Sequence, residues 1–161
     1  NKINKSTLKI ISVGNINKIK NHFFSIRSLS RYKSNYKYEI VGSKLKTQID
    51  LFNSIKRFIK LKKLQSKIKL LGYKNQKQIQ KYLKKNDIFL LPSITEGCPI
   101  SLLEALASGK LCICTKVGDI PIIIKNGING FLIKPNEKNL HKVLNQIKNL
   151  KQSSLKRIRI N

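Results

Sequence analysis

The sequence predicts a doubly wound α/β domain with a mainly parallel, Rossmann-like sheet. Short, apolar, branched segments alternate with amphipathic ones along the chain, and this alternation is typical of strands joined by helical crossovers. The strand candidates 87–92 and 111–115 are almost continuously apolar, as expected for strands buried on both faces of a parallel sheet. At 161 residues and 40% hydrophobic content, the chain fits one domain of this kind.

The expected elements follow in a regular order. Strands are expected at 8–13, 38–41, 67–71, 87–92, 111–115 and 131–133, and glycine ends the first three. Helices are expected at 21–32, 47–64, 76–85, 101–108 and 135–150. The clearest helical pattern is that of 47–64, where apolar residues recur every three or four positions from Ile49 to Ile59. We therefore expect a domain over 1–150, followed by a basic tail over 151–161 that is either disordered or docked on another domain.

The net charge of +27 suggests a nucleic-acid or membrane partner first. However, 29 Lys stand beside only five Arg, together with 25 Ile and 16 Asn, and Lys, Asn and Ile share A/T-rich codons. The Lys residues are also spread from Lys2 to Lys156, so compositional drift explains the charge better than a polyanion site. No basic motif with interleaved aromatics is visible, and nucleic acid is not expected as a partner. Weak attraction to anionic lipid remains compatible, at roughly 1 kcal/mol per Lys near the surface.

Neither a signal peptide nor an apolar run of about 20 residues is visible. The chain does not begin with Met, which suggests a piece of a longer protein. Its three cysteines, Cys98, Cys112 and Cys114, have no C-x-x-C spacing, and the last two are expected as buried small hydrophobes in a strand. A reducing, cytoplasmic location is expected, with or without peripheral contact to the cytosolic face of a membrane. No metal site is expected, because neither histidine is spaced from the cysteines as metal ligands are.

Three loops are expected at the carboxyl ends of the strands, where doubly wound sheets bind ligands: 14–21, 72–76 and 92–99. The last contains Glu96, and Glu104 follows one turn inside the next helix. A phosphate above 97–101 would satisfy the free N–H groups at that helix start. Alternatively, the two glutamates merely stabilise the helix N-terminus. For Glu104 alone both interpretations are equally good, but for both glutamates with Gly97 and Pro99 the ligand site is favoured.

The segment Glu96-Gly-Cys-Pro-Ile-Ser-Leu-Leu-Glu104 resembles the E-x7-E motif of retaining GT-B glycosyltransferases of family four, the glycosyl transferases group 1. The resemblance continues through 87–93 before the motif and through 105–109, 118–121 and 126–130 after it, and it covers about 8–150. It implies the C-terminal, donor-binding half of a GT-B fold. The N-terminal, acceptor-binding domain of that fold is missing from this chain.

The resemblance implies a role for each matching residue. Glu104 would hold the ribose hydroxyls of a sugar nucleotide. Glu96 would contact the transferred sugar near the reacting carbon, as an orienting and electrostatic catalytic residue or, which demands more of its geometry, as a covalent nucleophile. The loop between them would cradle the sugar and the distal phosphate with the backbone of Gly97, Cys98, Pro99, Ile100 and Ser101.

The segment 14–20 resembles the G-R-x4-K element of the same family, whose cations neutralise the diphosphate. Lys20 matches the lysine, whereas Asn15 stands at the arginine position, and Lys18 is an alternative cation. Tyr73 begins the loop in which the family holds the base. Two further positions depart from the family pattern: Ile122 replaces an acid and Lys44 replaces a glycine.

The resemblance implies transfer, with retention, of a hexosyl or N-acetylhexosaminyl unit from a nucleotide diphosphate sugar to a glycan or lipid-linked acceptor. No metal or other cofactor is expected. This segment alone should bind donor weakly and not turn over. The alternative is a non-catalytic, truncated GT-B domain whose basic surface binds anionic lipid or nucleic acid. His22 and His141 are expected on the solvent side of their helices, and Asp119 and Glu137 at helix starts.

Overall fold

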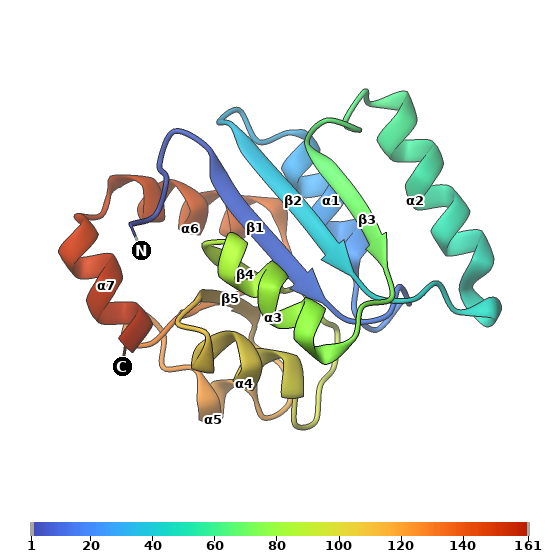
Figure 1. The fold of residues 1–161 in the computed structure, drawn as a ribbon. Helices are drawn as coiled ribbons and strands as arrows, with labels where there is room; N and C mark the ends of the chain where they lie inside the picture. Colours follow the sequence, from blue (N-terminus) through green and yellow to red (C-terminus); the bar gives the residue numbers. More distant parts are fainter. Residues whose placement is uncertain (1, 161) are drawn as a thin grey trace.

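The computed structural model describes residues 2–160 and shows one six-stranded sheet (Figure 1). The strand order is β3-β2-β1-β4-β5-β6, and all neighbouring strands pair in parallel. The strands are β1 (Leu8–Val13), β2 (Tyr36–Val41), β3 (Ile68–Gly72), β4 (Ile88–Leu91), β5 (Leu111–Thr115) and β6 (Phe131–Ile133). The predicted doubly wound, parallel α/β fold is confirmed.

The described residues form seven α-helices, of which the first five lie between successive strands and the last two follow β6. They are α1 (His22–Ser30), α2 (Ile49–Leu61), α3 (Gln76–Lys85), α4 (Ile100–Ala107), α5 (Ile120–Ile123), α6 (Glu137–Asn149) and α7 (Gln152–Ile160), with a short 3-10 helix at Lys46–Gln48. Helices α3, α4 and α5 cover one face of the sheet, and α1, α2 and α6 cover the other (Figure 1). Asp119 precedes α5 as expected, but its side chain makes no cap hydrogen bond.

The inner strands are apolar at successive positions because their side chains enter two separate cores. In β1, Ile10 packs into the core under α1, α2 and α6, and Ile11 packs into the core under α3, α4 and α5. Phe89 and Leu90 divide in the same way in β4. Successive strand residues point to opposite faces, so a strand covered on both faces needs apolar residues throughout.

The strand order reverses between β1 and β4, which places the switch point of the sheet there. The chain runs outward from β1 through β2 to β3 and then returns to β4 on the other side of β1. At such a switch point the loops leaving the two carboxyl ends diverge and open a crevice in which ligands bind. The candidate loops 14–21 and 92–99 leave from these two strands.

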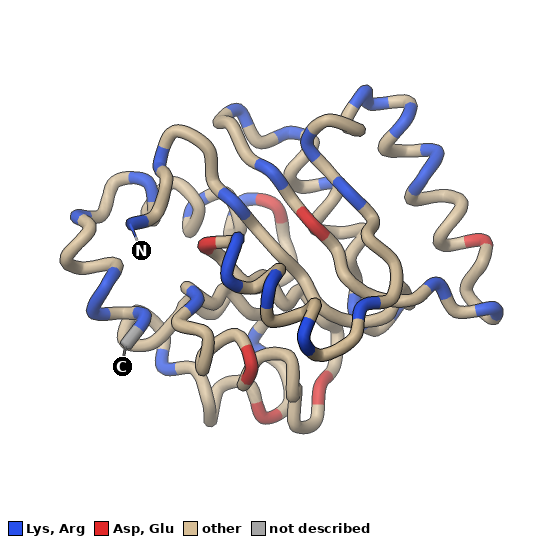
Figure 2. The backbone as a smooth tube through the Cα atoms, in the orientation of Figure 1, with Lys and Arg blue, Asp and Glu red and all other residues tan. Residues whose placement is uncertain are grey.

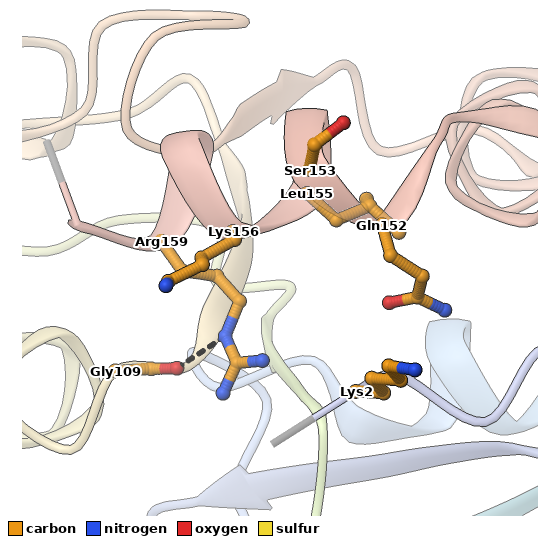
Figure 3. Close-up of a pocket in the computed structure, with 7 residues that line it drawn as sticks. All are labelled: Lys2, Gly109, Gln152, Ser153, Leu155, Lys156 and Arg159. Atoms are coloured by element: carbon orange, nitrogen blue, oxygen red, sulfur yellow. Dashed lines mark hydrogen bonds between the residues drawn. The ribbon is translucent and has the colours of Figure 1, made fainter.

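The sequence predicts a tail over 151–161 that is disordered or docked on another domain, but its described residues form a helix that docks on this domain. In α7, Leu155 and Ile158 are buried in the same core as Ile3. The side chain of Gln152 accepts from the Ile3 amide at 3.1 Å and donates to the Ile3 carbonyl at 2.8 Å. Arg159 Nε donates to the carbonyl of Gly109 at 2.5 Å (Figure 3). These contacts join the two ends of the chain.

A hollow of about 500 Å³ lies beside this contact (Figure 3). It lies at the amino end of the sheet, because Gly109 precedes β5 and Lys2 precedes β1, so it is separate from the crevice at the carboxyl ends. Its lining residues are Lys2, Gly109, Gln152, Ser153, Leu155, Lys156 and Arg159.

Leu155→Ala is expected to lower the free energy of unfolding by about 2–4 kcal/mol, because the side chain is 1% exposed and its loss leaves a cavity. Lys156→Ala, one residue along on the exposed side of the same helix, should change the stability by less than about 0.5 kcal/mol. Urea denaturation of both variants measures the difference. Equal stabilities would show that α7 does not dock.

His141 is half-buried, so the expected surface position is only partly correct. Its Nε2 lies 2.8 Å from the Ser28 carbonyl, and its ring lies 5.2 Å from that of Tyr32. The residue joins α6 to α1 and is remote from the switch point.

Candidate functional site

A lysine–glutamate pair lies at the centre of the switch point. Lys20 Nζ donates to both carboxylate oxygens of Glu96, at 2.7 and 3.0 Å, across 76 residues of sequence. The side chains of Lys20 and Glu96 are 22% and 8% exposed. The amide of Ile94 also donates to the Ile19 carbonyl at 2.8 Å and ties the two loops together. The structure therefore brings two predicted site residues from separate motifs into direct contact.

Three residues that the sequence analysis did not select hold Glu96 in place. Ser93 Oγ donates to Glu96 Oε1 at 2.5 Å, and Thr115 Oγ1 donates to the Ser93 carbonyl at 2.5 Å. Gly118, with φ +49°, lies so close that a Cβ there would be 1.7 Å from the Glu96 carbonyl oxygen. Ser93 and Thr115 are fully buried. The position of Glu96 thus depends on β5 and on the turn that follows it.

The loop after Glu96 leads to a helix start with donors to spare. Pro99 precedes α4, and no side chain caps the first turn of that helix. The first N–H groups of a helix have no intrahelical acceptor, and the end is electropositive. Gly97, Cys98 and Ile100 are exposed, Ser101 is half-buried and Pro99 is buried. An anion above this helix start would meet backbone donors, and the Lys20 ammonium is held on Glu96, three residues before Pro99.

Glu104 lies one turn further along α4 and is half-buried. Its Oε1 accepts from Gln76 Nε2 at 2.6 Å, and Gln76 is the first residue of α3. Tyr73, which begins the loop before α3, is 73% exposed. The loop predicted to hold a base thus leads directly to the glutamate predicted to hold a ribose.

A hollow of about 570 Å³ opens at the carboxyl ends of β2 and β3, next to this loop. Its lining residues are Gly42, Ser43, Lys44, Phe52, Lys56, Leu70, Leu71, Gly72 and Tyr73. Tyr73 and Lys44 are exposed at its edge.

Asn15, at the position of the missing arginine, makes a structural contact. Its Oδ1 accepts from the Ser43 amide at 3.0 Å, which joins the loop after β1 to the loop after β2. The same two loops approach closely at Gly42, where a Cβ would lie 2.0 Å from the Gly14 carbonyl oxygen. Lys18 is exposed. Lys20 is the cation of this loop that reaches Glu96.

The expectation that His22 faces solvent is wrong, because the residue is 1% exposed. It begins the buried stripe of α1, which continues with Ser25, Ile26 and Leu29, and this helical spacing was the signal available in the sequence. Its Nε2 lies 3.1 Å from the Gly14 carbonyl. Burial lowers the pKa of His22 to about 4; the Gly14 hydrogen bond opposes this shift and the Lys20 charge adds to it. The neutral ring therefore donates from Nε2 to the Gly14 carbonyl and supports the loop 14–21.

This burial predicts a loss of stability in mild acid. Unfolded His22 binds a proton below its usual pKa of 6.5, whereas folded His22 resists protonation down to a pKa of about 4. Stability linked to His22 is therefore lost as the pH falls from 6.5 towards 4, and it amounts to about 3 kcal/mol in all. His22→Gln keeps a donor for the Gly14 carbonyl but does not titrate. Between pH 7 and pH 4.5, urea denaturation should show the wild type losing roughly 2 kcal/mol more than the variant. Parallel losses would contradict this account of His22.

Cys112 and Cys114 are buried, as predicted. Burial raises the pKa of Cys112 to about 12 and that of Cys114 well above its usual value, so both thiols stay protonated. Within residues 2–160, no three His, Cys, Asp or Glu side chains lie together as they would around a metal ion. In the same part of the chain, no helix has the length and apolar character to span a membrane.

These features define a Rossmann-like domain with a candidate ligand site at the switch point of its parallel sheet. The chain belongs to the glycosyl transferases group 1 family, whose model matches residues 1–161. The predicted family and the GT-B character of the domain are confirmed.

Two curated relatives named as glycosyltransferases and one solved structure are similar to this chain. The amylovoran biosynthesis glycosyltransferase AmsK of Erwinia amylovora is 34% identical over 134 residues, covering 78% of this chain and 32% of its own. A UDP-Gal:alpha-D-GlcNAc-diphosphoundecaprenol alpha-1,3-galactosyltransferase of Escherichia coli is 39% identical over 74 residues, or 46% of this chain and 19% of its own. HepE of Anabaena, solved with UDP and glucose, superimposes with a TM-score of 0.89 at 20% identity, over 97% of this chain and 42% of its own. The match with this chain thus covers less than a third of the length of these two curated relatives.

Proposed function

We propose that this domain binds a nucleotide diphosphate sugar and forms the donor half of a retaining glycosyltransferase. The observation that carries the proposal is the Lys20–Glu96 pair at the uncapped start of α4. A cation, a carboxylate and free backbone donors meet at one point, which is the set that a sugar diphosphate needs. Glu104, one turn further along, is placed to accept hydrogen bonds from the ribose hydroxyls.

The proposed chemistry follows from these charges. Glycosyl transfer develops positive charge at the anomeric carbon and negative charge on the departing diphosphate. Lys20 and the N-terminus of α4 would stabilise the leaving group. This stabilisation is stronger in the transition state than in the ground state, because the negative charge on the diphosphate increases there. Glu96, held by Ser93 and Lys20, would orient the sugar hydroxyls near the reacting carbon. In this proposal the cationic partner of the diphosphate comes from the chain itself, without a metal.

The acceptor and the compartment are part of the same proposal. The E. coli relative is named for transfer from UDP-Gal to a diphosphoundecaprenol-linked sugar. We accordingly propose a hexosyl or N-acetylhexosaminyl donor and a glycan or lipid-linked acceptor, at the cytosolic face of a membrane. A further domain would supply the acceptor wall of the cleft. The 161-residue chain alone would then bind donor weakly, and measurable transfer by it would contradict this part of the proposal.

A double-mutant cycle tests the ribose role of Glu104. UDP, GDP and their 2′-deoxy forms are titrated by calorimetry against the wild type and Glu104→Ala. Glu104→Ala alone and loss of the 2′-hydroxyl alone should each weaken binding by roughly tenfold. When both are combined, binding should weaken by much less than the product of the two single effects, because both changes remove the same interaction. Glu137→Ala removes a carboxylate from the first residue of α6, where it is paired with Arg31, and serves as the control.

Two outcomes would contradict the assignment. If the effects of the two changes multiply, Glu104 does not bind the ribose 2′-hydroxyl. Absence of binding by every nucleotide, together with salt-sensitive binding to RNA or lipid vesicles, would instead favour the alternative of a non-catalytic basic domain.

A further inference from the structure

A groove runs between α2 and the edge strand β3, and we call it the α2 groove. Its volume is about 700 Å³, and its lining residues are Phe52, Lys56, Arg57, Ile59, Lys60, Gln65, Ile68 and Leu70. None of them belongs to the loops 14–21 or 92–99 that form the donor site. Strand β3 is the first strand of the sheet, so this side of the domain has no further strand beyond it (Figure 1).

The groove has an apolar floor and a cationic rim. Apolar side chains contribute the floor, with Ile59 and Ile68 buried. Lys56, Arg57 and Lys60 are exposed at the rim, and the lining residues include no acid. The ion pairs found within residues 2–160 do not involve these three cations. The rim therefore presents a positive charge that is not offset by a salt bridge in the described part of the chain.

Two ammonium groups also meet at one ring near the end of the groove. Lys44 Nζ and Lys56 Nζ each lie 5.8 Å from the centroid of Phe52. They come from different elements, the loop after β2 and helix α2. Phe52 and Lys56 also line the hollow beside Tyr73, so the groove opens towards the carboxyl edge of the sheet.

An exposed leucine continues the rim. Leu61, the last residue of α2, is 73% exposed and lies four residues after Arg57, on the same side of the helix. Lys60, Lys62 and Lys63 surround it in sequence. The apolar face of α2 is buried in the core, so Leu61 is the apolar side chain among these cations that can enter the interface of an anionic bilayer while the cations bind its phosphates.

We propose that the α2 groove and Leu61 form a docking surface for a membrane that contains anionic phospholipid. The rim cations bind headgroup phosphates, and Leu61 enters the boundary with the acyl chains. A nucleic acid fits less well, because Phe52 is half-buried under two lysines and offers no free face on which a base could stack. Docking here would hold the carboxyl edge of the sheet near a lipid-linked acceptor, and it deepens the proposed function in this one respect.

Charge alone cannot establish the surface, because Lys and Arg occur on every side of the domain (Figure 2). The test therefore compares two variants that each remove three positive charges. One is K56Q/R57Q/K60Q on the rim, and the other is K77Q/K81Q/K84Q, all exposed on α3 across the sheet. Both are cosedimented with phosphatidylcholine vesicles with and without phosphatidylglycerol, at about 0.15 M salt, where the Debye length is about 8 Å.

The rim variant should bind the anionic vesicles at least about tenfold more weakly than the wild type. The α3 variant should bind the anionic vesicles no more than roughly threefold more weakly than the wild type, because it loses only long-range electrostatic attraction. Leu61→Ser, which removes no charge, should weaken vesicle binding by roughly fivefold and leave the binding of an RNA oligonucleotide unchanged. Urea denaturation confirms that all variants fold, and UDP titration separates this surface from the donor site.

Equal losses in the rim and α3 variants would overturn the docking surface. So would vesicle binding that does not respond to Leu61→Ser. Tighter binding to RNA than to vesicles, lost in the rim variant, would assign the groove to nucleic acid instead. None of these results depends on whether the domain binds a nucleotide sugar.

Discussion

Gly118→Ala is expected to weaken nucleotide binding by tenfold or more and, under the proposed function, to slow glycosyl transfer by the full-length protein about a hundredfold. A Cβ at this position would lie 1.7 Å from the Glu96 carbonyl oxygen, so the loop that carries Glu96 has to move by more than 1 Å. A displacement of that size in a catalytic site costs about two orders of magnitude in rate. Calorimetric titration of UDP and GDP measures the binding effect directly.

The matched control is Gly127→Ala. Gly127 also has a positive φ, +78°, but a Cβ there would meet open space. Both substitutions introduce left-handed strain of about 1–2 kcal/mol, and only Gly118→Ala displaces the site. If the two variants bind nucleotide equally well, Gly118 does not set the position of Glu96 for binding.

Lys20→Gln should weaken the binding of a nucleoside diphosphate by roughly 10- to 100-fold, because it removes a charged hydrogen bond worth about 1.5–3 kcal/mol. Binding of the nucleoside without phosphates should be unchanged. Calorimetry with UDP and with uridine, or with GDP and guanosine, separates the two effects.

Lys18→Gln removes the same charge from an exposed position of the same loop and serves as the control. It should change diphosphate binding by less than about threefold, through long-range attraction alone. A larger loss with Lys18→Gln than with Lys20→Gln would make Lys18 the diphosphate cation and would contradict the role given to Lys20.

The fold was predictable because its signals are local. Apolar runs such as 111–115 and glycine stops such as Gly72 indicated how many strands there are and where they lie along the chain. Helix ends were less accurate, since α2 was expected to reach residue 64 but ends at Leu61. Lys63 adopts a φ of +52° in the turn that follows, a conformation that cannot be predicted from the residue type alone.

The site was predictable only in part. The resemblance identified Lys20 and Glu96 in separate roles, but their contact depends on β1 and β4 lying side by side. The support from Ser93 and Thr115 likewise requires β4 next to β5. These contacts arise from tertiary structure, and no local pattern in the sequence encodes them.

The sequence contains helical spacing that indicates the buried faces at His22 and α7, but the polar residue types there pointed to the opposite interpretation. His22 lies in register with Ile26 and Leu29, and Leu155 and Ile158 are three residues apart on one side of α7. The polar residue type of His22 favoured a solvent-facing position, and the basic composition of 151–161 favoured a tail that is disordered or docked on another domain. The helical spacing was the better guide.

A backbone-amide NMR titration with UDP or GDP shows where the nucleotide binds without relying on any substitution. If the nucleotide binds at the switch point, the largest shifts fall in the loop 14–21 and at the start of α4, with smaller shifts near Tyr73. Shifts confined to the hollow beside α7 or to the α2 groove, with the Lys20 and Glu96 loops unaffected, would contradict binding at the switch point.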